Sequence, residues 1–148
     1  VTPVSPFRAT PPVARRRATS HAMSMRDDFE FEFNMPQKGI TEFGIAQVKL
    51  PPVLENSEIK VVRYNLPFGL DAAPDTVDDK PQVVVTKDGK GGEKVGDILR
   101  QTTVWRGTTP ALFDVSKNAA NFDSVIGALV SNDLTVTDEI VMVFERPL

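Results

Sequence analysis

The stretch VGDILRQTTVW, residues 95–105, places a Val-Gly-Asp turn directly before a run that predicts a β-strand over residues 97–105. Outward from it, runs rich in β-branched and alternating residues predict further strands. These strands cover residues 57–66, 82–87 and 138–147, with a short one at 111–115. The sequence therefore predicts a small β-rich domain around residues 95–105.

One amphipathic helix is predicted between the last two strands. Asn121 is a good N-cap, and Asp123 is favourable in the first turn. Apolar residues recur at spacings of three and four along one face, namely Phe122, Val125, Ile126, Leu129 and Val130. Strands with one main helix predict an α+β domain in residues 57–148.

The order of these segments resembles that of a PDZ domain. Phe68-Gly69-Leu70 resembles the carboxylate-binding loop of that family, and Val95-Gly96-Asp97-Ile98-Leu99 resembles its characteristic turn and strand. The resemblance implies a partly open β-barrel or sandwich that captures C-terminal peptides between a strand edge and the helix. The peptide-site candidates are Phe68, Gly69, Leu70, Phe122 and Ile126.

Three residues depart from the peptide-binding pattern. Asp71 would repel an incoming carboxylate, and Pro74 removes a donor from the pairing edge. Phe122 stands where many members have a polar residue that selects the ligand, and a phenyl ring would fill the groove. We therefore expect weak peptide capture or none, with the domain used mainly as a docking body.

Residues 27–56 predict an extended segment that ends in a linker at Pro51-Pro52. Phe29, Phe31 and Phe33 alternate with acidic residues, so three rings lie on one side of an extended chain. Two interpretations remain open: an edge strand on the protein's own domain, or an adhesive strip on a partner. We list the three rings as partner-docking candidates and predict no second core in this segment.

Residues 1–26 form a basic arm rich in Pro, Arg and Ser. The arm has five arginines and no acid, whereas residues 27–148 have 12 basic and 20 acidic side chains, a net charge of −8. Its composition is that of an organelle transit peptide or of a retained arm held against a partner. Arg15, Arg16 and Arg17 are its docking candidates.

The composition argues against catalysis. The chain has no cysteine, and its one histidine, His21, lies in the basic arm. Neither a Gly-x-Ser-x-Gly motif nor a P-loop occurs. No metal site, nucleic-acid site or membrane-spanning helix is predicted, because the body is acidic and no apolar run approaches 20 residues.

A transit-like arm, an aromatic segment and a PDZ-like body together resemble plastid PDZ-like proteins of algae. The resemblance implies a non-catalytic scaffold subunit at the periphery of the thylakoid membrane, on the stromal side. Its partners would be photosystem core and antenna subunits, whose chlorophyll or carotenoid would lie nearby without a cofactor bound by this chain. The alternative is a soluble plastid adaptor or assembly factor that binds C-terminal peptides.

Overall fold

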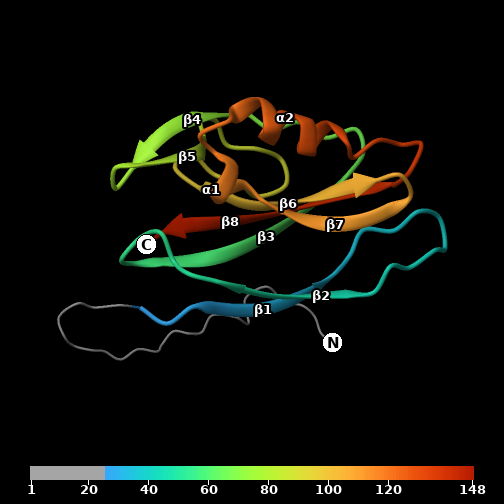
Figure 1. The fold of residues 1–148 in the computed structure, drawn as a ribbon, viewed down its shortest axis with the longest axis horizontal. Helices are drawn as coiled ribbons and strands as arrows, with labels where there is room; N and C mark the ends of the chain where they lie inside the picture. Colours follow the sequence, from blue (N-terminus) through green and yellow to red (C-terminus); the bar gives the residue numbers. More distant parts are fainter. Residues whose placement is uncertain (1–25) are drawn as a thin grey trace.

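A computed structural model describes residues 26–148 (Figure 1). Eight strands form a two-stranded and a six-stranded sheet, with two short helices. The strands are β1 (Phe29–Asn34), β2 (Ile45–Leu50), β3 (Ser57–Asn65), β4 (Ala72–Val77), β5 (Lys80–Val85), β6 (Ile98–Arg106), β7 (Thr109–Asp114) and β8 (Glu139–Pro147). The helices are α1 (Val115–Asn118) and α2 (Phe122–Val130).

The larger sheet is antiparallel, in the order β3-β8-β6-β5-β4, with β7 also paired to β6. Each strand predicted from the sequence is present, and Asn121 caps α2 by accepting a hydrogen bond from the Ser124 N–H. The prediction of a mainly β domain with one main helix is confirmed at this coarse level. The sheet curls into a half-barrel, and β4, which the sequence left doubtful because of Pro74, is a full strand.

The first hydrophobic core lies between α2 and the curled sheet. Ile140, Met142 and Phe144 of β8 point into it, and all three are fully buried. Val125 and Leu129 of α2 cover them from above. This packing follows from the spacing of apolar residues along α2, which places one face of the helix on the sheet.

A second core lies on the opposite face of β8, where the β1–β2 hairpin forms another layer (Figure 1). Val141 and Val143 of β8 pack there against Phe31 and Phe33. The prediction of an extended segment without a core in residues 27–56 is therefore wrong. The alternation of β1 is real, but its apolar face is buried by the protein's own sheet.

A buried ion pair fastens the hairpin to the sheet. The Glu145 carboxylate accepts hydrogen bonds from the Val53 and Leu54 backbone N–H groups and from Ser57 Oγ. Arg100 Nη1 lies 2.6 Å from Glu145 Oε1, and both side chains are almost completely buried. The bonds from Val53 and Leu54 fix the linker between β2 and β3, and the Arg100 guanidinium neutralises the Glu145 carboxylate that accepts them. The two layers are therefore joined by polar bonds as well as by apolar packing.

Candidate functional site

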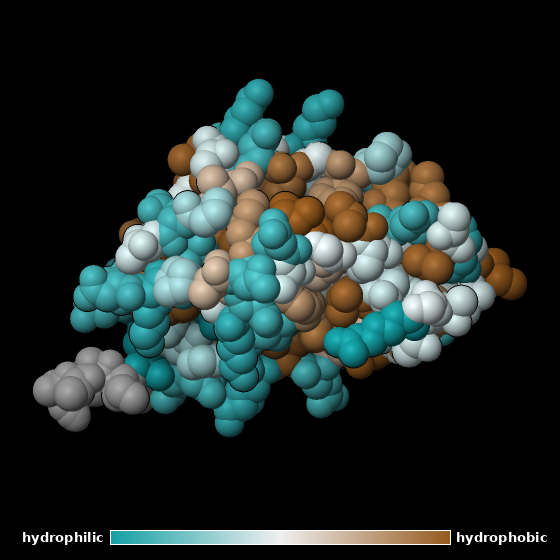
Figure 2. All heavy atoms as spheres, turned by 45° about the horizontal axis from the view of Figure 1, so that its top comes forward, coloured by the Kyte–Doolittle hydropathy of each residue, from teal (hydrophilic) through white to brown (hydrophobic). Residues whose placement is uncertain are grey.

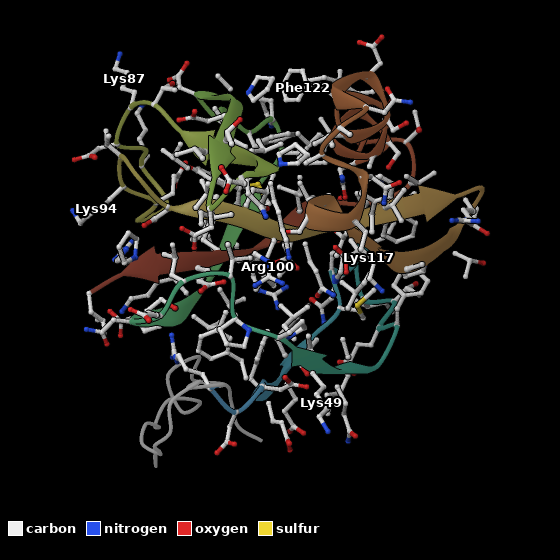
Figure 3. The ribbon with its side chains drawn as sticks, turned by 60° about the vertical axis from the view of Figure 1, so that its left-hand side comes forward. Lys49, Lys87, Lys94, Arg100, Lys117 and Phe122 are labelled. Atoms are coloured by element: carbon white, nitrogen blue, oxygen red, sulfur yellow. The ribbon has the colours of Figure 1, made fainter. Side chains whose placement is uncertain are left out.

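The predicted peptide-site residues gather around the gap between β4 and α2. Phe122 begins α2, and in Figure 3 its side chain lies between the helix and β4. Phe122, Phe68 and Leu70 are half-buried and pack against the first core. Ile126 follows Phe122 by one turn on the same side of α2, and 42% of it is exposed. Phe68, Leu70 and Phe122 therefore pack on one core, with Phe122 between α2 and β4.

The loop between β3 and β4 has unused donors. Within the described residues, the backbone N–H groups of Phe68, Gly69 and Leu70 donate no hydrogen bond. A Cβ added at Gly69 would meet nothing within 4 Å, so this loop is open on its outer side. Free donors in succession are one requirement of a carboxylate-binding loop.

The edge of β4 is poorly suited to receive a peptide. The Thr86 N–H donates a hydrogen bond to the Asp71 carbonyl, which sets the register of β4 on β5. In this register the backbone nitrogens of Ala72, Pro74 and Thr76 point away from β5. Pro74 has no proton, and the Thr76 N–H already donates to its neighbour's carboxylate, Asp75 Oδ1. Only Ala72 therefore offers a free donor along this edge.

An exposed apolar surface begins on α2 and continues toward one end of the molecule. Figure 2 shows hydrophobic atoms gathered over α2 and toward the right-hand end of that view. The surface consists of Ile126, Val130 (64% exposed), Leu134 (53%) and Ile40 (98%), and we call it the α2 surface. Side chains this exposed cost free energy in water, and a contiguous group of them is typical of a protein contact.

The loop that presents Ile40 is held beside the α2–β8 connection. Lys38 Nζ donates to the Leu134 carbonyl at 2.6 Å, and the Gly39 N–H donates to Asp138 Oδ2 at 2.6 Å. The Gly39 bond, with a smaller contribution from Lys38, lowers the pKa of Asp138 below its usual value. Ile40 and Leu134 thus lie on two loops that are bonded to each other.

The other predicted docking residues have different outcomes. Phe31 and Phe33 are buried in the second core, so their assignment to a partner interface is wrong. Phe29 is half-buried, and the Arg26 guanidinium lies 5.2 Å from its ring centroid. Arg15, Arg16 and Arg17 lie outside the described residues.

Buried carboxylates outside this region have structural roles. Asp97 binds the Arg146 guanidinium through both oxygens, at 2.9 and 2.8 Å. Glu93 accepts a hydrogen bond from Tyr64, and burial together with this bond raises the pKa of Tyr64. A Cβ at Gly89 would come within 1.9 Å of Glu93 Oε2, so a side chain there would displace the Glu93 carboxylate. These pairs hold the β5–β6 loop against the sheet.

Among residues 26–148 no group of three or more His, Cys, Asp or Glu side chains could hold a metal ion. No helix in the same range is long and apolar enough to cross a membrane. The sequence predicted neither the α2 surface as a whole nor the role of Ile40. The usable signal for the α2 surface was that the predicted apolar face, with Ile126 and Val130, is wider than one sheet contact can cover; the helix pattern holds no signal for Ile40.

Comparison with known proteins gives no relative: no family model, no curated protein and no solved structure matches this chain.

Proposed function

We propose that this protein is a PDZ-like, non-catalytic docking subunit that binds a larger protein assembly through the α2 surface. The observation that supports this most directly is the exposure of Val130, Leu134 and Ile40 on adjoining segments while Phe122 occupies the gap beside β4. The PDZ-like fold is supported by the element order and by the loop at Phe68–Leu70. From the sequence resemblance, the proposed assembly is a photosystem with its antenna at the plastid thylakoid.

Lysine at both Val130 and Leu134 should release the protein from its assembly. Two charges would enter an apolar contact, and we expect the attachment to weaken at least about tenfold. Lysine at the end of α2 is compatible with the helix dipole, so the fold should be retained. The measurement is comigration of the tagged protein with the chlorophyll-containing fraction in a density gradient, together with a thermal melt of the isolated variant.

The matched control is Val95→Lys, because Val95 is 61% exposed and lies in the β5–β6 loop, next to Lys94 on the far side from α2 in Figure 3. It should comigrate like the unaltered protein. Full comigration of the double variant, or equal loss with the control, would contradict the α2 surface as the docking site.

The free N–H groups of Phe68–Leu70 favour a second candidate function, the capture of C-terminal peptides. We expect the unaltered protein to bind such peptides more weakly than about 100 μM. The reasons are the blocked β4 edge, the nearby carboxylate of Asp71, and Phe122 in the gap. The measurement is binding to a library of random peptides with free C-termini.

Phe122→Ala should open the gap, and we expect peptide affinity to rise at least about tenfold because the ligand side chain gains the vacated volume. The same peptides with amidated C-termini are the control, since they lack the carboxylate. Low-micromolar binding by the unaltered protein would favour the adaptor function over the docking subunit.

A further inference from the structure

The six-stranded sheet has three outer strands, β3, β4 and β7, and the edges of β3 and β4 differ in how they are protected. Two hydrogen bonds just beyond the ends of the β3–β8 pair show which β3 residues bond to β8. The Leu66 N–H donates to the Asp138 carbonyl, and the Leu148 N–H donates to the Asn56 carbonyl. In this register the even-numbered residues pair with β8 and the odd-numbered ones point their backbone groups outward. The outward residues are Ile59, Val61, Arg63 and Asn65.

This edge lacks two of the devices that usually prevent pairing, a proline and a β-bulge. Residues 59–65 contain no proline, and their pairing with β8 has no register shift. Arg26 donates to the Ser57 carbonyl, so the open stretch begins after that residue. The opposite edge, at β4, has Pro74 at an outward position. Exposed strand edges are normally blunted in this way, and an unblunted edge is a template for another strand.

A pocket lies directly beside the open edge. Its volume is about 400 Å³, and residues of β3 and of the end of β1 line it. Val61 and Arg63 of β3 form one wall, and Phe33 and Met35 form an apolar wall on the hairpin side. Arg63 spans the two layers by donating to the Asn34 carbonyl and to Glu139 Oε1. The pocket could accept one medium-sized apolar side chain.

We propose that β3 accepts an extended segment of a partner protein as an added strand, with one apolar side chain of that segment in the pocket. This surface is separate from the α2 surface and goes beyond the docking function proposed above. Main-chain hydrogen bonds would supply affinity, and the pocket would select the residue opposite Val61 or Arg63. At this edge Lys60 pairs with Glu58 and Arg63 pairs with Glu139, so a segment of low net charge with an apolar side chain is favoured.

A second copy of the chain fits this edge less well. The Ile59 and Val61 side chains of the second copy would already be covered by its own hairpin, as they are here in the second core. They could not enter the pocket of the first copy. The pocket therefore favours a segment whose apolar side chain is uncovered.

The test uses the full chain and a display library of random ten-residue linear peptides, from which the strongest binder is synthesised. Amide exchange followed by NMR should show fast exchange at Val61, Arg63 and Asn65 in the free protein and slow exchange with the peptide bound. Val62 and Tyr64 should be protected in both states. Replacing the peptide's central apolar residue with serine, or methylating alternate peptide nitrogens, should reduce affinity at least about tenfold.

Val61→Pro removes one outward donor without removing a bond to β8, and it should weaken peptide binding at least about tenfold. Thr76→Pro is the matched control, because Thr76 is exposed at an outward position of the opposite edge strand β4, and it should change peptide affinity by less than about threefold. The proposal is overturned if no peptide is selected or if the protected amides lie on β4. It is also overturned if N-methylated peptides bind with the same affinity as unmethylated ones. Protection of the β3 amides that appears without peptide when the protein concentration is raised would indicate pairing with a second copy and would overturn it too.

Discussion

Replacing Phe33 with alanine is expected to lower the free energy of unfolding of the isolated protein by about 3–5 kcal/mol. Phe33 is 3% exposed and packs in the second core against β8. Its removal takes away apolar burial and leaves a cavity between the two layers. For a domain of this size the melting temperature should fall by roughly 10–20 °C. Urea unfolding followed by far-UV circular dichroism measures the change.

Ile45→Ala is the matched control, because Ile45 belongs to the same hairpin and is 53% exposed. We expect its effect to stay within about 0.5 kcal/mol. The comparison separates self-packing from docking, since a ring reserved for a partner would leave the isolated protein unchanged. An equal, small effect of both substitutions would mean that the hairpin does not pack on the sheet as described.

Glu145→Ala should also lower the free energy of unfolding, by about 3–5 kcal/mol. The substitution leaves the Arg100 guanidinium buried without its counter-charge and removes the acceptor of the Val53 and Leu54 N–H groups. Because the pair is shielded from solvent, salt should screen it little. The free energy of unfolding in urea, measured at low and at high NaCl concentration, tests both statements.

The double variant Arg100→Met, Glu145→Met tests how much of this loss comes from the unpaired Arg100 guanidinium. Apolar residues of similar length replace both charges, so the double variant should be more stable than Glu145→Ala alone. The linker N–H groups still lack an acceptor, so part of the loss should remain. A loss below about 1 kcal/mol for Glu145→Ala would show that this network does not hold the linker.

The sequence predicts β1 well and its packing partner poorly. A period of two shows that one side of a strand is buried, but it does not say which surface covers that side. The missing information was in residues 140–144, Ile-Val-Met-Val-Phe, where apolar residues occupy both faces of one strand. A continuous apolar run indicates a strand buried on both sides, which requires a second layer.

The candidate site was predicted in part. Phe68, Gly69, Leu70, Phe122 and Ile126 were named from the resemblance, and three of them, Phe68, Leu70 and Phe122, pack on the first core. The open edge of β3 could not be predicted, because sheet order depends on contacts between distant segments. The pairing of Arg100 with Glu145 was missed for the same reason, although a charged residue inside each apolar strand was a usable signal.

The position of β8 between the two cores has a consequence for synthesis of the chain on the ribosome. Until β8 has left the exit tunnel, neither apolar layer has its central wall. The nascent chain would then expose the aromatic strip of β1 and the inner faces of β3 and β6 at the same time. Because exposed apolar strands aggregate, we expect the incomplete chain to depend on chaperones until β8 can pair with β3 and β6.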